Sequence, residues 1–412
     1  MNEGFKLYRY RWVVLALFMF VNLTIQILWI SYAPITGPAA AYYGVSDLAI
    51  GFLAMSFMIA FIPLSIPVSW AIDTFGFHKT VGVGAALMGV CGILRGLTGD
   101  NYLMVLLTTI GLAISQPFLL NAWTKMPALW FAAKERATVV GLVTLSNLAG
   151  TAIGMVATPL LAQTMSIPRV QLVYGGIAAF SALLFILFTR EKPATPPCLA
   201  GDDARALMLD GLKHAFTVKS FWLYLIVSFI GLGIFNGVTT WTESIIRPRG
   251  FSPQDAGTVG ALMLGGGVLG AVIMPILSDR SGRRKPFMIA GFLLGIPGLV
   301  GLAFAQTAPL LFASSFFAGF FLVSVNPIGM QYASEIARPT PEGTSNGLIQ
   351  LCGQASVVFV YLMSAMKSRN GSFTSSLLFA VLLLIVGAFL MSMMKEMKLP
   401  ASAKAEGKSA GE

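Results

Sequence analysis

Twelve long apolar stretches constrain this chain more than any other feature of its sequence. A helix needs about 20 apolar residues to cross the hydrocarbon core of a bilayer. Stretches of this length occur at roughly 12–36, 48–72, 79–98, 102–129, 137–162, 169–189, 220–245, 255–278, 286–304, 308–335, 343–366 and 373–394. Composition agrees, because 56% of the residues are hydrophobic, only 11% are charged and the mean hydropathy is +0.79. We therefore predict an all-α polytopic membrane protein with twelve transmembrane helices.

The loops after the second and eighth spans have the same layout. Asp73 and Asp279 each end an apolar run, and each is followed three residues later by a glycine and then by cations. These two aspartates are 206 residues apart, which is half of the 412 residues. Glu135 and Glu342, which each precede a Gly-rich apolar helix, repeat nearly the same offset, 207 residues. The spacing indicates a duplicated unit.

The duplication predicts two pseudo-symmetric six-helix halves joined by a polar linker. The linker opens with a Pro-rich stretch, and apolar residues then recur at helical spacing between Asp203 and Phe216. This pattern predicts a short amphipathic helix at the membrane surface. The predicted parts are an N-terminal half at 1–189, the linker at 190–219, a C-terminal half at 220–395 and a disordered tail at 396–412.

The distribution of cations predicts the orientation in the membrane. Twenty of the 27 Lys and Arg residues lie on the side of the N-terminus, six lie on the other side, and Lys125 lies inside the fourth span. By the positive-inside rule, both termini and the linker are cytoplasmic, and we expect a plasma (inner) membrane location. The net charge of +10 is thereby explained as a topology signal. We expect no nucleic-acid partner, no cofactor or metal, and a monomer in the lipid bilayer.

This arrangement resembles the major facilitator superfamily. The resemblance covers the whole chain, and the loop at Asp279 matches the superfamily's cytoplasmic motif better than the loop at Asp73 does. It implies that these loops clamp the two halves together on the cytoplasmic side, with Asp73, Asp279 and Arg283 as gating residues. An aspartate near the start of a helix complements the helix dipole, which would favour such a clamp. Alternatively, the cations only hold the topology.

Three further residues are gating candidates. Glu135 and Glu342 repeat across the two halves, as described above. Lys125 lies about one turn inside the cytoplasmic end of the fourth span, from which a lysine can extend its ammonium group to the surface. We interpret Lys125 as an inner-gate or orientation residue.

Several separated motifs resemble a narrower family, the feline leukaemia virus subgroup C receptor-related family. They occur in order and are Arg11-Trp-Val-Val-Leu-Ala, Trp29-Ile-Ser-Tyr, Gln116-Pro-Phe-Leu, Trp130-Phe with Glu135, Asn147-Leu-Ala-Gly-Thr-Ala-Ile-Gly154, and Tyr332-Ala-Ser-Glu-Ile-Ala-Arg-Pro with Pro341-Glu-Gly-Thr-Ser-Asn-Gly347. Characterised members of that family move choline and ethanolamine, and haem export has also been proposed for it. The resemblance implies a small-molecule transporter of this kind.

Polar and aromatic residues at mid-depth are the candidates for substrate binding, because transporters hold their solutes near the bilayer midplane. The candidates are Gln26 and Trp29 in span one, Gln116 in span four, Asn147 in span five, Asn236 in span seven, Asn326 in span ten and Gln354 in span eleven. By resemblance, Trp29, Gln116 and Gln354 fall where the family places its aromatic wall and two amide ligands. Asn236 departs from the family, which has a tyrosine there, and Trp241 could partly replace that ring.

Each candidate also has a structural interpretation. Gln26, Asn147 and Asn326 could instead bond to a neighbouring helix, which contributes about 1 kcal/mol or less. Trp29 could be a lipid-facing or core aromatic residue. No Asp, Glu or His lies at mid-depth by this reading, and Glu243, near the outer end of span seven, is better interpreted as an ion-pair or vestibule residue beside Arg247.

We therefore expect a secondary transporter that moves a small amine or amino-alcohol-like solute by alternating access and facilitated diffusion. Alternatives within this class are a proton-coupled exporter and an organic-anion carrier. An alternative from another class is a non-transporting membrane receptor or sensor. An enzyme is not expected, because no nucleophile with a base and no metal cluster occurs at one depth.

Overall fold

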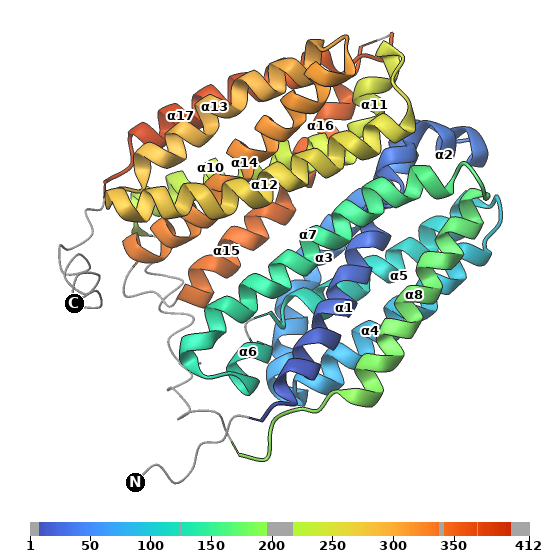
Figure 1. The fold of residues 1–412 in the computed structure, drawn as a ribbon, viewed down its shortest axis with the longest axis vertical. Coiled ribbons are helices and arrows are strands. Elements are labelled where there is room, and N and C mark those ends of the chain that lie inside the picture. The colour runs from blue at the N-terminus through green and yellow to red at the C-terminus, as the bar shows by residue number, and fades with distance from the viewer. Residues whose placement is uncertain (1–7, 124, 196–216, 338–341, 369, 397–412) are drawn as a thin grey trace. The chain divides into compact units, whose positions relative to one another are not determined.

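The computed structural model describes residues 8–123, 125–195, 217–337, 342–368 and 370–396 (Figure 1). Within these ranges, the side chains of 133, 134, 137, 334 and 342–347 are not described. The predicted amphipathic helix of the linker lies outside the described residues, and so does all but the first residue of the predicted tail.

The first six membrane spans are built from nine helical segments. They are α1 (Arg11–Ile30), η1 (Ala33–Ile35), α2 (Thr36–Tyr43), α3 (Asp47–Phe75), α4 (Phe77–Leu97), α5 (Tyr102–Leu120), α6 (Lys125–Trp130), α7 (Ala133–Leu161) and α8 (Ile167–Phe188). Side chains cap two of the starts, where Ser46 accepts from the backbone of Ala49 and Asn101 from that of Met104, each at 3.2 Å. Such caps satisfy amide groups that the first turn leaves unpaired.

The other six spans contain a similar set of segments. They are α10 (Lys219–Thr240), α11 (Thr242–Ile246), η2 (Arg247–Arg249), α12 (Pro253–Ser281), α13 (Lys285–Phe304), α14 (Ala308–Ile336), α15 (Glu342–Ala355), α16 (Val357–Ala365) and α17 (Thr374–Ser392). Together the described residues form 12 helices that are long and apolar enough to cross a membrane. The predicted fold class and number of spans are confirmed.

Four predicted spans are each interrupted by a break. The span predicted at 102–129 breaks after Leu120, where α5 ends. The first span breaks after Ile30, and the short 3-10 helix η1 that follows has a proline at position 34, its second residue. The seventh span breaks at Trp241 and the eleventh at Ser356. Proline disfavours helical geometry in the residue before it, whereas the breaks at Trp241 and Ser356 have no proline beside them. Discontinuous helices commonly build solute sites in transporters, because they free polar groups within the membrane.

Contacts divide the chain into two compact units that do not coincide with the two predicted halves. Unit 1 comprises Met1–Asp203, Asn236–Leu264 and Val357–Thr374, and unit 2 comprises Ala204–Phe235, Gly265–Ser356 and Ser375–Glu412. Unit 1 thus contains the first six spans and also parts of the seventh, eighth and eleventh. The division into two six-helix halves stays a prediction.

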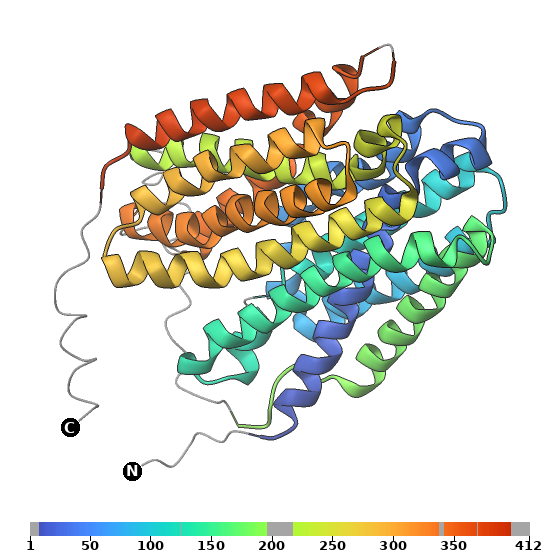
Figure 2. The same cartoon turned by 45° about the horizontal axis from the view of Figure 1, so that its top comes forward.

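Helix packing within each unit places the candidate residues. In unit 1, α1 packs against α7 and α8, and α4 packs against α5 and α8 (Figures 1 and 2). Aromatic rings fill part of this core, where the Phe77 ring lies 5.5 Å from Phe18 and 5.7 Å from Phe185, centroid to centroid. In unit 2, α13 packs along α14. Most of the candidate residues lie in unit 1.

Candidate functional site

Three of the polar and aromatic residues on α1 form a stripe along one helix face. Asn22, Gln26 and Trp29 follow the spacing i, i+4, i+7, which places them one above another on a helix. Asn22 is buried and accepts a hydrogen bond from the indole N–H of Trp123 at 2.7 Å. Trp29 is half-buried, and its own indole N–H donates to the Ala54 carbonyl on α3 at 3.2 Å. The stripe therefore combines amide groups with an indole whose orientation α3 helps to fix.

Four buried amide side chains keep hydrogen-bonding capacity that the described residues of the protein do not use, and three of them are predicted site residues. The atoms of these three are Gln26 Oε1 on α1, Gln116 Oε1 on α5 and Asn147 Nδ2 on α7, and the fourth atom is Gln171 Nε2 on α8. Helix α1 contacts both α5 and α7. A buried polar atom without a partner costs about 1–3 kcal/mol, and most such atoms in proteins have partners. Three of the predicted site residues thus retain capacity to bind a polar solute.

Trp241 does not present a free ring in this structure. It is fully buried, and its indole N–H donates to the Val360 carbonyl on α16 at 2.9 Å. One edge of the indole contacts α3 at Gly51, where a Cβ atom would lie 2.1 Å from Trp241 Cη2. The ring centroid also lies 5.7 Å from that of Phe373. Trp241 therefore packs the segments 236–264 and 357–374 onto α3 inside unit 1.

The remaining predicted binding residues are half-buried. Asn236 lies on α10, near the end at which that helix breaks. In unit 2, Asn326 lies on α14 directly before Pro327, and Gln354 lies at the end of α15, two residues before the break at Ser356. Gln354 and Trp29 thus lie next to interruptions of their respective spans.

In unit 1, the predicted gating residues form ion pairs near one end of the bundle. The Lys125 ammonium lies 2.8 Å from Asp73 Oδ1, and the Arg11 guanidinium lies 3.1 Å from Glu135 Oε1. Glu191, which sequence reasoning did not single out, binds the start of α4. Its carboxylate accepts from the backbone N–H groups of residues 77 and 78 at 2.8 and 2.7 Å. A carboxylate at this position satisfies unpaired amides and complements the helix dipole.

In unit 2, the buried cation of the motif is Arg284. Its guanidinium contacts Asp279 and lies 3.2 Å from Glu335, and both Arg284 and Glu335 are buried. The predicted gating residue Arg283 is exposed instead. Glu342 begins α15, and its side chain lies outside the described part of the structure. Position 284, rather than 283, thus carries the ion pairs of this loop.

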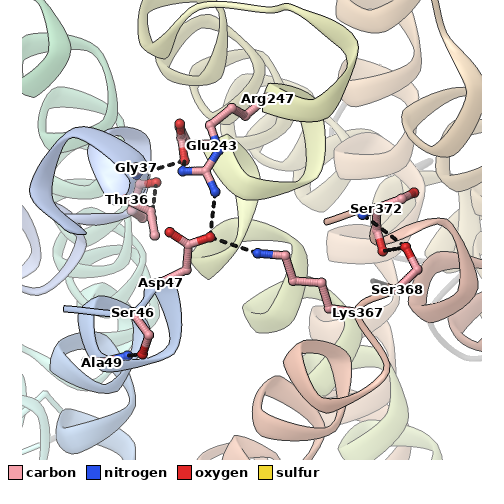
Figure 3. A network of polar contacts seen from close by, with 11 residues as sticks. Thr36, Gly37, Ser46, Asp47, Ala49, Glu243, Arg247, Lys367, Ser368 and Ser372 are labelled. Atoms are coloured by element: carbon pink, nitrogen blue, oxygen red, sulfur yellow. Dashed lines mark hydrogen bonds and ion pairs between the residues drawn. The ribbon is translucent and has the colours of Figure 1, made fainter. Parts of the chain in front are cut away.

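A second polar network lies at the end of unit 1 where α3 begins (Figure 3). The Asp47 carboxylate accepts from the Arg247 guanidinium and from the Lys367 ammonium, the latter at 2.8 Å. The Glu243 carboxylate accepts from the Gly37 backbone N–H at 3.0 Å and from Arg247 at 3.4 Å. We call these five residues the Asp47 network. The predicted ion-pair role of Glu243 is confirmed.

Close packing and charge explain the composition of this network. A Cβ atom at Gly37 would lie 2.0 Å from Arg247 Nη1, so a larger residue there would displace the guanidinium from this position. Gly37 lies in the first turn of α2, where a carboxylate is favourable. Burial raises the pKa of Glu243 above 4.5, although Arg247 and the Gly37 N–H act in the opposite direction. The charged form of this carboxyl group is thus stabilised by Arg247 and the Gly37 N–H, with a smaller contribution from Lys367.

A shallow groove of about 480 Å³ in unit 1 does not involve the predicted binding residues. It is lined mainly by apolar side chains of α3, α16 and the start of α5, among them Leu48, Phe52, Met55, Ile59 and Tyr361. Several of these side chains are exposed within membrane spans. The groove has too few polar groups for a small polar solute.

The first comparison with known proteins identifies the family. The family model for the Major Facilitator Superfamily matches residues 14–265 and 243–411. The chain belongs to the major facilitator superfamily. This transporter is therefore an integral membrane protein that carries a small-molecule substrate, and its relatives are transporters rather than enzymes.

Two of the similar curated proteins are named as choline/ethanolamine transporters. The transporter is 28% identical over 401 residues to "Choline/ethanolamine transporter flvcr2b" of Danio rerio, covering 92% of this chain and 83% of that protein. It is 27% identical over 412 residues to "Choline/ethanolamine transporter FLVCR2" of Homo sapiens, covering 95% and 78%. It is also 28% identical to "Solute carrier family 49 member A3" of Danio rerio, covering 90% and 81%. The resemblance inferred from the separated motifs is confirmed.

Solved structures of low sequence identity support the fold. A bacterial homolog of the human lysosomal transporter Spinster, inward-facing and unoccupied, has a TM-score of 0.76 at 15% identity, covering 94% of this chain and 97% of that one. A point mutant of the nucleoside transporter NupG has a TM-score of 0.73 at 13% identity, covering 93% and 100%. The transporter thus has the major facilitator fold.

Proposed function

We propose that this transporter moves a small organic amine or amino alcohol by alternating access, as facilitated diffusion. The main supporting observation is the set of buried amide atoms without described partners on α1, α5 and α7, together with the indole on α1. The proposed solute contacts are Trp29, Gln26, Gln116 and Asn147. Asn236, Asn326 and Gln354 are proposed as further contacts, on the sequence argument.

The chemistry of these groups favours a cationic, zwitterionic or neutral solute. An indole face attracts an ammonium group by about 0.5–2 kcal/mol, and more where water is excluded. Amides can bond a hydroxyl group without fixing a charge. A carboxylate solute would require a cation beside these contacts. The Lys125 ammonium pairs with Asp73 instead, and the buried guanidinium of Arg95 is occupied by the Leu28 carbonyl and by neutral side-chain oxygens. The relatives named as choline/ethanolamine transporters support the same solute class.

The positions of the acidic residues support transport without proton coupling. Each carboxylate in the described part of the chain lies within three residues of a helix end or in a loop. These residues are Asp47, Asp73, Asp100, Glu135, Glu191, Glu243, Asp255, Asp279, Glu335, Glu342 and Glu396. The described histidine, His78, is the second residue of α4. A proton relay through the membrane normally uses acids or histidines at mid-depth, so facilitated diffusion is the simpler mechanism.

We further propose that both termini face the cytoplasm, because 20 of the 27 Lys and Arg residues lie on that side. In this orientation, Asp73, Lys125 and Glu135 act at the cytoplasmic gate, as do Asp279, Arg283 and Glu342. The Asp47 network then lies at the opposite face of the membrane. Labelling of single cysteines with an impermeant reagent at Lys395 and at Tyr42, in whole cells, tests this orientation. Reaction at 395 but not at 42 would contradict it.

Uptake into proteoliposomes tests the proposed solute. Labelled choline and ethanolamine, with a small carboxylate for comparison, are supplied with and without a pH gradient. We expect saturable uptake of an amine that the gradient does not change. Trp29→Ala and Gln116→Leu should each raise the KM about tenfold, which corresponds to about 1.4 kcal/mol of lost binding energy.

Matched substitutions elsewhere control for general damage. Trp70 on α3 is 61% exposed and Gln163 is also exposed, so Trp70→Ala and Gln163→Leu should leave uptake unchanged. Uptake of carboxylates but not of amines would contradict the proposal. Gradient-driven accumulation that Glu243→Gln abolishes would instead establish proton coupling through that residue.

A further inference from the structure

Arg95 is a buried cation that the proposed function does not use. It lies in the last turn of α4 and is 1% exposed. Among the described residues, no carboxylate lies within ion-pair distance of its guanidinium. Burying an unpaired cation in a membrane protein is costly, and such residues are usually functional. The contacts of Arg95 indicate what offsets that cost.

Nearly all of the partners of Arg95 lie where α1 ends. Nη1 donates to the Leu28 carbonyl at 3.0 Å, and Nη2 donates to Ser31 Oγ at 3.3 Å. The guanidinium carbon lies 5.4 Å from the centroid of the Tyr32 ring. The remaining partner is Gln171 on α8, whose Oε1 accepts from Nη2 at 2.6 Å. Ser31 also donates to Gln171, at 3.2 Å, so the two acceptors of Nη2 are themselves linked.

The end of a helix explains why a cation is favourable here. The last four carbonyl groups of α1 have no partner within the helix, and the negative end of the helix dipole lies there. Arg95 donates to one of these carbonyls and stacks on the first ring beyond the break. A guanidinium suits this role because its planar fork binds several acceptors while its face packs on an aromatic ring.

Trp29 lies between the residues that Arg95 holds. Leu28 precedes it, Ser31 follows it by two positions, and both contact the guanidinium. We propose that Arg95 is a positioning residue for Trp29. Arg95 anchors the broken end of α1 to α4 and α8, and it thereby fixes the direction of the Trp29 indole. This inference rests on the proposed function of Trp29 in binding the solute. Arg95 itself does not contact the solute.

Fluorine NMR of protein labelled with 5-fluorotryptophan tests this role without any solute. The chain has 7 Trp residues, and Trp29→Phe identifies the resonance of Trp29. We expect Arg95→Gln to shift or split the Trp29 resonance and to leave the other six in place. Arg95→Lys should shift the same resonance by less, because an ammonium group still donates to Leu28 but cannot form the planar fork. Arg169→Gln, at an arginine on α8 near the same end of the bundle, is the matched control and should change nothing.

Transport kinetics provide the second measurement. With choline or ethanolamine as the probe, Arg95→Gln should raise the KM about tenfold and leave kcat within about twofold of the unaltered transporter. An unchanged Trp29 resonance in Arg95→Gln, with the other six preserved, would overturn the inference. If Arg95→Gln does not fold, Arg95→Lys and Ser31→Ala decide, because each removes only part of the anchoring, and an unshifted Trp29 resonance in both would also overturn it. Absence of amine uptake in every variant would contradict the proposed function, whereas the resonance would still test the positioning role.

Discussion

Removing the charge of Asp47 should open the end of unit 1 that the Asp47 network closes. The carboxylate accepts from two cations on segments distant in sequence, Arg247 and Lys367. Asp47→Asn keeps the size of the side chain but removes the charge that both cations need. The segments 236–264 and 357–374 would then be held to α3 mainly by apolar packing, such as that around Trp241.

The expected magnitude follows from how exposed the network is. The Asp47 side chain is 19% exposed, whereas that of Arg247 is 37% and that of Lys367 is 25% exposed. Hydrogen bonds to charged groups contribute about 1.5–3 kcal/mol when buried, but ion pairs in contact with solvent contribute only about 0.2–1 kcal/mol. We therefore expect the two pairs together to stabilise the closed arrangement by about 1–2 kcal/mol, which is a five- to thirtyfold change in population.

Double electron-electron resonance measures this population directly. Spin labels at Tyr42 and Asn370, both exposed in unit 1, are introduced in a background without the three native cysteines. Asp47→Asn should add a longer-distance component, whereas Asp100→Asn, at an exposed carboxylate in the loop between α4 and α5, should not. An unaltered distance distribution in Asp47→Asn, or an equal change in Asp100→Asn, would refute the reasoning.

Three further outcomes follow from the same contacts. Because burial raises the pKa of Glu243, the closed arrangement binds its proton more tightly than a hydrated carboxyl group does, so acidification from neutral pH to about 4.5 should favour closure. Glu243→Gln should remove that pH dependence in the same resonance assay. Gly51→Val would overlap the Trp241 indole and should weaken closure by about 1–3 kcal/mol. The control Gly176→Val, at a position with nothing within 4 Å of an added Cβ, should leave closure unchanged. The same distance measurements check both variants. Asp73→Asn and Asp279→Asn should each weaken the state that is closed on the cytoplasmic side by a few kcal/mol at most, and unchanged distances across the cytoplasmic helix ends in both variants would contradict the clamp.

The apolar stretches made most of the fold predictable. Each predicted span corresponds to one helix or to consecutive helical segments, and the span predicted at 48–72 is α3 (Asp47–Phe75). Mid-depth polar residues were equally visible, because an amide in an otherwise apolar run stands out. The sequence could not predict which amides keep hydrogen-bonding atoms without a partner, because this depends on which helices pack together. These amides include Gln26, Gln116 and Asn147.

Tertiary contacts also gave several charged residues roles that local sequence does not indicate. Arg95 lies near the end of a predicted span, where a cation normally reaches the surface, so the sequence alone does not predict its burial. Asp47 follows a serine at a helix start, a position that alone explains an acidic residue. Glu191 lies in a polar loop with no motif around it. In each case the decisive partner lies far away in the sequence, such as the Leu28 carbonyl for Arg95.

The first span connects the proposed solute contact with the Asp47 network. Trp29 and Gly37 are separated by eight residues, and the break held by Arg95 lies between them. A displacement of α1 at Trp29 would reach Gly37 only if that break transmits it. Arg95→Gln and Asp47→Asn therefore form a double-mutant cycle: additive effects on the population measured at Tyr42 and Asn370 would mean independent sites, and a non-additive term above about 0.5 kcal/mol would mean coupling. Since coupling between sites requires an element with two arrangements, the broken first span is the element in this chain best suited to that role.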